Sequence, residues 1–311
     1  MAKKRKDLHI GDKAFYWILK VMAFGIILLL LAFFVLLFKM SWPVLSKVGP
    51  SFFWFNDWNP VTEEYGALPF IFGTIATSLI ALFLAVPISL GAALLITEIA
   101  DGGVRKILGF LVEMLAAIPS VVYGLWGLFV VVPFLRETVQ PFLSKYFGVL
   151  PIFEGAPLGV GLMASGIVLA IMITPTIATI SREIFLTIPK VYKEGALALG
   201  ATRWEMIRLS ILKSSVSGIL GASILGLGRA LGETMAVAMV IGNRAEISAS
   251  LFSPAQSMAS LIANEYAEAS GDMHLASLTA IGFGLLIVSF FMNSTARIIV
   301  WRVERKYKGT R

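Results

Sequence analysis

Two ionisable residues lie inside an apolar run of the sequence, and their types suit the binding of an anion. Arg229 and Glu233 are four residues apart, a spacing that places them on one face of a helix. An ionisable group in mid-membrane costs roughly 3 kcal/mol by insertion scales, so such groups are kept where they face water or a partner. The guanidinium of Arg229 suits two-pronged binding of an oxyanion. We predict that Arg229 lines a substrate pathway with Glu233 as its tether; the alternative is a structural ion pair that neutralises itself.

A second candidate element is the polar stretch 189–213. It predicts a short helix that begins near Pro189, a break at Gly200 and a second amphipathic stretch that includes Trp204. Glycine is expected at such a break because it allows the chain to turn closely against another backbone. Taken alone, the pattern is equally typical of an amphipathic helix on a membrane surface.

The composition requires a membrane around these elements. Of the 311 residues, 58% are hydrophobic and only 14% are charged, whereas soluble domains carry roughly a quarter charged residues. The apolar residues form long uncharged runs of the length that crosses a hydrocarbon core. We therefore predict an all-α membrane protein with about six transmembrane helices. The chain has no cysteine, which excludes disulfides and thiolate metal sites, and the widely separated His9 and His274 indicate solvated surface histidines.

The predicted spans organise the chain as a basic tail (1–14), a first transmembrane helix (15–38), an extracytoplasmic loop (39–69), a core (70–300) and a second basic tail (301–311). The first span is too long for a signal peptide and is followed by no small-residue cleavage site. Prolines within spans indicate broken or closely packed helices. The spans are Phe15–Phe38, Phe70–Ile99, Ile107–Pro133, Leu158–Ile180, Val216–Ile241 and Leu275–Val300, and the prolines are Pro87, Pro119 and Pro175.

The basic residues predict the orientation. With a cytoplasmic N-terminus, 20 of the 26 Lys and Arg residues are assigned to inside segments and five to outside loops, and Arg229 alone is left within a span. The inside count includes Lys20 and Arg297, which lie near the cytoplasmic ends of the first and last predicted spans. Cytoplasmic loops carry the excess of Lys and Arg in membrane proteins. Both termini are therefore expected in the cytoplasm, and the net charge of +7 reflects topology rather than nucleic-acid binding.

The stretch 189–213 resembles the coupling loop of ATP-binding-cassette importer permeases, whose pattern is Glu-Ala-Ala, three residues, Gly, nine residues, Ile-x-Leu-Pro. Glu194, Ala196, Gly200 and Leu212 match this pattern. The chain departs from it where Gly195 replaces the middle Ala, Ser210 takes the Ile position and Lys213 replaces the Pro. The resemblance implies that Glu194, Gly195, Ala196, Gly200 and Trp204 contact a separate ATPase subunit.

Three further segments resemble the phosphate permease family of the PstC type: Gly226–Val237, Glu113–Gly127 and Ile180–Pro189. The resemblance implies the type I ABC importer permease (MetI-like) architecture in a prokaryotic cytoplasmic (inner) membrane. It also implies a second homologous permease of the PstA type, a dimer of PstB-type ATPases and an extracytoplasmic phosphate-binding protein of the PstS type. In the implied mechanism, ATP binding and hydrolysis on the ATPase dimer open the pore alternately outward and inward for inorganic phosphate.

The chain itself is expected to be no enzyme and to hold no cofactor, with ATP and Mg bound on the partner. It has no G-x-x-x-x-G-K-[ST] sequence, so it lacks the usual phosphate-binding loop of an ATPase. The glycines of 226–232 lie in an apolar helix without a preceding strand, and we interpret them as a close packing face. Two alternatives stay open, a permease for another oxyanion such as molybdate or sulfate, and a phosphate-sensing signalling scaffold. A secondary transporter is disfavoured, because ion-coupled transport does not call for the Glu194–Gly200 loop.

Overall fold

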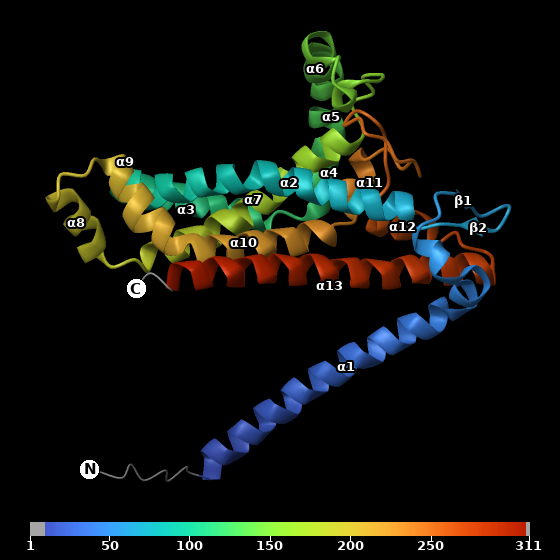
Figure 1. Ribbon diagram of the computed structural model, residues 1–311, viewed down its shortest axis with the longest axis horizontal. Helices are drawn as coiled ribbons and strands as arrows, with labels where there is room; N and C mark the ends of the chain where they lie inside the picture. The colour runs from blue at the N-terminus through green and yellow to red at the C-terminus, as the bar shows by residue number, and fades with distance from the viewer. Residues whose placement is uncertain (1–9, 309–311) are drawn as a thin grey trace.

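The computed structural model describes residues 10–308, which are almost entirely helical (Figure 1). The α-helices are α1 (Ile10–Val48), α2 (Leu68–Leu94), α3 (Gly102–Ala117), α4 (Ser120–Trp126), α5 (Val132–Phe134), α6 (Gln140–Phe147), α7 (Leu162–Leu186), α8 (Lys190–Ala198), α9 (Arg203–Met206), α10 (Lys213–Leu231), α11 (Met235–Val240), α12 (Met258–Glu265) and α13 (Asp272–Lys308). Four π-helical segments extend or join them: Leu95–Ile99, Gly127–Val131, Leu135–Val139 and Ile207–Leu212. Two 3₁₀ turns lie at Gly49–Phe53 and Pro151–Phe153.

Six helical segments are long and apolar enough to cross a membrane, which confirms the predicted fold class. They are Gly11–Phe53, Leu68–Ile99, Ser120–Phe147, Leu162–Leu186, Arg203–Leu231 and Asp272–Val303. The two named strands of the described residues form a small antiparallel hairpin of β1 (Trp58–Asn59) and β2 (Glu64–Tyr65). It lies at the opposite end of the molecule from α8 (Figure 1). We call these ends the hairpin end and the α8 end.

The core is built around α7. This helix packs against α2, α3 and α10, and α13 lies alongside α10 (Figure 1). Leu169, Met172 and Ile173 of α7 are fully buried. A side chain at Gly166 would come within 2.4 Å of Ile80, so glycine is needed where α7 and α2 approach closely. Such contact between helix backbones replaces the hydrophobic driving force, which is weak between helices in lipid.

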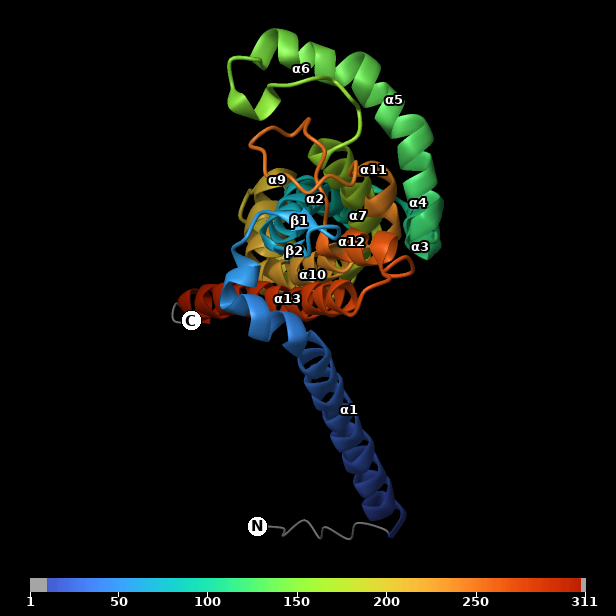
Figure 2. The ribbon, with the colours of Figure 1, turned by 90° about the vertical axis from the view of Figure 1, so that its right-hand side faces the viewer.

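The predicted third span is wrong as a single helix. Ile118 and Pro119 are extended, with ψ of 129° and 142°, and they separate α3 from α4. The residue before a proline is driven away from helical geometry by the proline ring. Of the three prolines predicted to lie in broken or closely packed helices, only Pro119 lies at a helix break. Pro87 and Pro175 lie inside the uninterrupted helices α2 and α7. Beyond the break, α4 to α6 curve away from the bundle as an arm (Figure 2).

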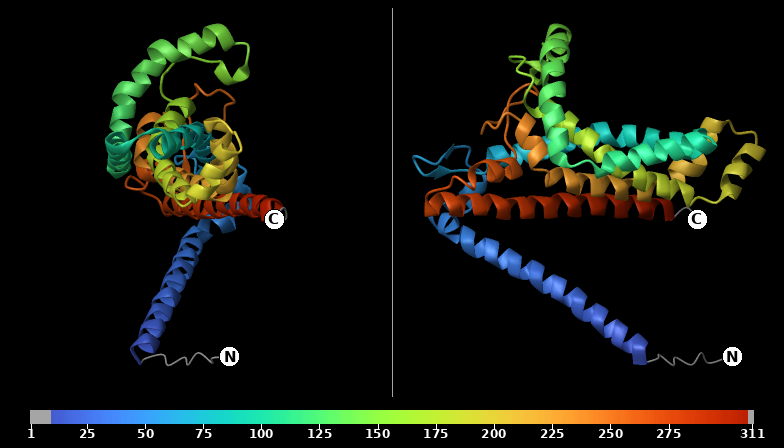
Figure 3. Two further views of the ribbon diagram at one scale, coloured as in Figure 1. Left: turned by 90° about the vertical axis from the view of Figure 1, so that its left-hand side faces the viewer. Right: turned by 180° about the vertical axis from the view of Figure 1, so that it is seen from behind.

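The first helix is longer than predicted. It continues from Ile10 through Pro43 to Val48, whereas the sequence pattern placed its end at Phe38. The helix continues because its last turns have a core to pack against, where Val44 and Phe52 are fully buried. Phe34 contacts Phe283 of α13 with ring centroids 5.1 Å apart. Toward its N-terminus α1 stands apart from the bundle (Figure 3), and its apolar side chains are exposed there.

At the hairpin end, a polar cluster joins three elements. Trp58 of β1 donates from Nε1 to Glu265 Oε2 of α12 at 3.0 Å, and His274 Nε2 of α13 lies 3.0 Å from the same oxygen. The His274 ring also stacks on Tyr65. The prediction of a solvated His274 is therefore wrong, because its side chain is only 13% exposed. Burial, and then the nearby Glu63 and Glu265 carboxylates, raise the pKa of Tyr65 above its usual 10. His9 lies outside the described residues.

Candidate functional site

Arg229 lies near the end of α10, half-buried against α7. Its Nη1 donates a hydrogen bond of 2.8 Å to Thr176 Oγ1 of α7. Among the described residues, no carboxylate forms a salt bridge with Arg229. A guanidinium carries five N–H donors, and a neutral hydroxyl satisfies only one of them without cancelling the charge. Arg229 thus keeps a positive charge and further donors for another group.

The spacing predicted that Glu233 and Arg229 lie on one helix face, and the structure contradicts this prediction. Helix α10 ends at Leu231, and Gly232 caps it with φ of −94° and ψ of 0°. Glu233 follows in the break, where its Oε1 accepts a 3.2 Å hydrogen bond from the Ala236 amide at the start of α11. The expected tether between Glu233 and Arg229 is therefore wrong, and the single fifth span predicted over 216–241 is divided. A carboxylate at a helix N-terminus is favoured by the unpaired amides and the helix dipole there.

The predicted ATPase-contact residues lie together at the α8 end (Figure 1). Glu194 and Gly195 are exposed on α8, and Ala196 is half-buried on the same helix. Trp204 of α9 is 62% exposed. Tryptophan is highly buried on average in folded proteins, so an indole this exposed is notable. The α8 end therefore presents both polar and aromatic side chains on its surface.

The predicted break at Gly200 is confirmed. Helix α8 ends at Ala198, and Gly200 follows with φ of +85°. Only glycine adopts this conformation without strain. A Cβ at Gly200 would meet nothing within 4 Å, so the backbone angle, rather than lack of space, requires glycine here. The next helix, α9, begins after its N-cap residue Thr202, whose hydroxyl and backbone form a capping box with Glu205. A capping box satisfies the free backbone amides at the start of a helix.

Two polar contacts fasten α8 to the membrane-spanning bundle. Lys193 Nζ lies 2.6 Å from Glu98 Oε1, and the Glu98 side chain is only 9% exposed. Ser210 Oγ donates to the Tyr192 carbonyl at 3.0 Å. Glu98 belongs to the π-helical segment that ends α2. The Lys193–Glu98 contact therefore joins α8 to the end of α2, and a nearly buried charged pair of this kind resists separation.

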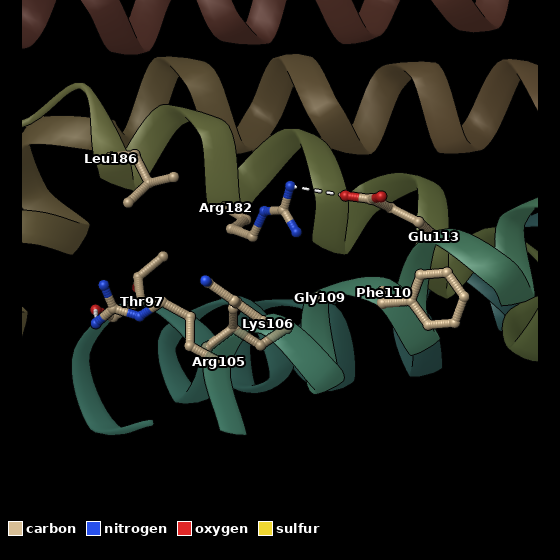
Figure 4. A pocket seen from close by; sticks show the side chains of 9 residues that line it. Thr97, Arg105, Lys106, Gly109, Phe110, Glu113, Arg182 and Leu186 are labelled. Carbon is tan, nitrogen blue, oxygen red and sulfur yellow. Dashed lines mark hydrogen bonds and ion pairs between the residues drawn. The ribbon is translucent and has the colours of Figure 1, made fainter. Parts of the chain in front are cut away.

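A second ion pair, between α3 and α7, was missed from the sequence. Arg182 Nη2 of α7 lies 2.9 Å from Glu113 Oε1 of α3 (Figure 4). The same nitrogen lies 2.9 Å from Oε1 of the neighbouring Glu183. The sequence pattern placed Arg182 in a loop, whereas it lies within the last turns of α7. Glu113 was the available signal, because an acidic residue inside a predicted apolar span calls for a counter-ion. Arg182 is thus neutralised, in contrast to Arg229.

The charge at the site suits an anion. Within residues 10–308, no group of three His, Cys, Asp or Glu side chains is placed to hold a metal ion. His274 is occupied by its contacts with Glu265 and Tyr65. The polar groups that can act together at this place are the guanidinium of Arg229 and the Thr176 hydroxyl that it contacts. Of these two, only the guanidinium carries a positive charge that can attract an oxyanion.

Residues 85–305 match the family model described as the binding-protein-dependent transport system inner membrane component. The chain is 46% identical over 306 residues to a phosphate transport system permease protein PstC of Pasteurella multocida, covering 97% of this chain and 95% of that protein. It is 37% identical over 276 residues to a probable phosphate transport system permease protein PstC of Methanocaldococcus jannaschii, covering 87% of this chain and 86% of that protein.

Two solved structures share the fold. A bacterial ABC transporter that imports the acidic polysaccharide alginate aligns with a TM-score of 0.61 and 19% identity, covering 94% of this chain and 98% of that chain. The inward-facing MetNI methionine ABC transporter aligns with a TM-score of 0.56 and 18% identity, covering 75% of this chain and 94% of that chain. The helical architecture described above is therefore that of ABC importer permeases.

Proposed function

This chain belongs to the family of binding-protein-dependent transport system inner membrane components, and from that membership we propose that it forms part of the pore of an ATP-driven importer of inorganic phosphate. The phosphate permeases that resemble it, among them the Pasteurella protein at 46% identity, cover nearly the whole chain. The chain is a non-catalytic membrane subunit, and ATP hydrolysis takes place on a partner.

The observation that carries this proposal is the unneutralised charge of Arg229. A hydroxyl, not a carboxylate, holds its guanidinium, so the charge remains available to an anion that enters the bundle. Phosphate would otherwise lose its hydration without compensation, which is costly for any charged group in a medium of low polarity. A guanidinium offers phosphate a paired set of donors, and the hydrogen bond to Thr176 fixes the direction in which that fork points.

We further propose that α8 and the turn at Gly200 dock into a PstB-type ATPase dimer. Support comes from the exposure of Glu194, Gly195 and Trp204 and from the pattern that this loop shares with importer permeases. Closure of the ATPase dimer on ATP would then move α8, and the contact between Lys193 and Glu98 would carry that movement into α2.

The exposed apolar surfaces favour a second permease of the PstA type as a direct neighbour. The arm formed by α4 to α6 curves away from the bundle (Figure 2), and α1 diverges on another side. On the arm, Phe129 is 71% exposed and Phe134 is 57% exposed. A homologous subunit and lipid would together cover these faces. An extracytoplasmic PstS-type protein would deliver phosphate at the hairpin end.

ATP-dependent uptake by the assembled transporter tests the proposal. The chain is co-purified with its partner subunits, reconstituted into vesicles and supplied with binding protein and labelled phosphate. We expect an ATPase and a second permease to co-purify and phosphate to accumulate only with ATP. Equal or faster uptake of labelled sulfate or molybdate would instead assign the chain to another oxyanion. ATP-independent uptake would exclude an ATP-driven importer.

A further inference from the structure

A basic pocket lies at the α8 end, apart from Arg229. It has a volume of about 280 Å³ and lies between the end of α2, the start of α3 and the end of α7. Figure 4 shows Arg105, Lys106 and Arg182 around the same space. The lining residues are Ile96, Thr97, Arg105, Lys106, Gly109, Phe110, Glu113, Arg182 and Leu186. Three cations therefore line the pocket against one carboxylate.

Two of these cations are free of acidic partners. Arg105 donates from Nη2 to the Thr97 carbonyl at 2.8 Å, which fixes the guanidinium and leaves its other donors available. In the part of the chain that the structure describes, neither Arg105 nor Lys106 belongs to a salt bridge. Arg182, in contrast, is neutralised by Glu113 and Glu183. The pocket thus keeps a positive charge that no described side chain cancels.

The sequence of α3 builds the pocket wall. Arg105, Gly109 and Glu113 recur at intervals of four and lie on one helix face. A Cβ at Gly109 would lie 2.8 Å from Arg182 Nη1, so the missing side chain is what lets Arg182 reach Glu113. Arg105 and Lys106 lie in the first turns of α3, directly after its N-cap residue Asp101.

We propose that this pocket binds a phosphate group. Two sources present that chemistry at this end of the bundle: the headgroup of an anionic phospholipid, or inorganic phosphate that has passed Arg229. The apolar rim formed by Phe110 and Leu186, which are 58% and 53% exposed, suits the acyl chains of a lipid. The inorganic phosphate source rests on the proposed transport function, whereas the lipid source does not.

The test uses the full chain in its assembled transporter, placed in nanodiscs of phosphatidylcholine with or without phosphatidylglycerol. Native mass spectrometry counts the phosphatidylglycerol molecules retained, and equilibrium dialysis measures radiolabelled inorganic phosphate bound in phosphatidylcholine alone. The variant Lys106→Gln removes one pocket charge. Arg302→Gln is the matched control, because it removes one charge from an exposed residue of α13 at the same end. Lys106→Arg keeps the charge.

Loss of one retained phosphatidylglycerol in Lys106→Gln, but not in Arg302→Gln or Lys106→Arg, identifies a lipid headgroup. Phosphate binding that is weakened about tenfold in Lys106→Gln alone identifies the free anion, since a charged hydrogen bond contributes about that factor. If Lys106→Gln and Arg302→Gln behave alike in both measurements, the inference is overturned. Phosphate uptake by the unmodified complex is scored separately. A complex that fails to import phosphate but retains lipid through Lys106 refutes only the transport function.

Discussion

At the scale of single residues, the two arginines inside the bundle show two ways to hold a guanidinium in a membrane. Arg182 is paired with two carboxylates, which cancels its charge and makes it part of the framework. Arg229 is held by the hydroxyl of Thr176, which fixes its direction while leaving its charge. The difference decides which of the two can attract an anion, because the carboxylates beside Arg182 already offset its charge, whereas the hydroxyl beside Arg229 does not.

Replacing Arg229 should therefore abolish transport without preventing assembly. We expect Arg229→Gln to lower ATP-dependent phosphate uptake by roughly 100-fold, because the desolvated anion loses a charged partner. Arg229→Lys keeps the charge but loses the fork, and it should transport poorly. Uptake of labelled phosphate is normalised to assembled complex. Because Glu233 does not pair with Arg229, the double variant Arg229→Gln/Glu233→Gln should stay inactive, and recovery of its uptake would reduce the arginine to a structural role.

The Thr176 hydroxyl should matter through Arg229 alone. Thr176→Val preserves shape but removes the hydrogen bond that orients the guanidinium, so we expect uptake to fall about tenfold. Thr174→Val is the matched control on the same helix, since the Thr174 hydroxyl donates to the Ala170 carbonyl of its own helix. Michaelis constants for phosphate are measured for both variants in vesicles. Equal effects of the two substitutions would show that Thr176 does not position Arg229.

At the scale of elements, the loop between α8 and α9 depends on one backbone angle. Gly200→Val forces a β-branched residue to φ of +85°, so the turn should rearrange and uptake should fall at least tenfold. Gly221→Ala is the control within α10, where a Cβ would also meet nothing within 4 Å, and it should remain active. Co-purification of the ATPase is measured beside uptake. Full activity of Gly200→Val would remove this turn from the coupling mechanism.

The contact between α8 and the end of α2 can be tested by exchanging its charges. Lys193→Met leaves Glu98 nearly buried and unpaired, so we expect phosphate uptake to fall about tenfold or more while the ATPase remains bound. The exchange Glu98→Lys/Lys193→Glu restores the pairing and should recover part of the loss. Lys190→Met on the same helix is the control, since Lys190 is exposed. No recovery in the exchanged variant would show that the pair does not link α8 to α2.

At the scale of the whole molecule, the long axis of the bundle separates two chemically different ends. The α8 end carries α8, α9 and the basic pocket, and the hairpin end carries the cluster of Trp58, Glu265 and His274 (Figure 1). The arm and α1 leave apolar faces beside the bundle. Under the proposed function, a neighbouring subunit and lipid would cover these faces.

The two ends should face opposite sides of the membrane, with both termini in the cytoplasm. The motivation is the excess of Lys and Arg in the segments predicted to be inside. A reporter fused after Arg311 should resist external protease in intact cells. A protease site inserted after Val61, which is 91% exposed in the hairpin loop, should be cut under the same conditions. Digestion of the reporter with protection of the Val61 site would reverse the orientation.

The sequence by itself determined the number and approximate position of the spans, the helix, break and helix of the 189–213 loop, and the family. These features are local: a long apolar run, a glycine at a turn and a fixed motif spacing each act within a few residues of the chain. The sequence also marked Arg229 as exceptional, because a single charge in an apolar run is visible without any neighbours. The predicted span boundaries were wrong where a break interrupts a helix, as at Pro119 and Gly232.

Only the tertiary structure decided which groups those charges meet. Arg229 contacts Thr176, 53 residues away, rather than Glu233 one turn along. Lys193 contacts Glu98 across 95 residues, and Arg182 contacts Glu113 across 69. Such pairs depend on how each helix is rotated about its axis and how far it slides against its neighbour. Close packing of small residues such as Gly109 and Gly166 sets both quantities, and no periodicity within a single helix records them.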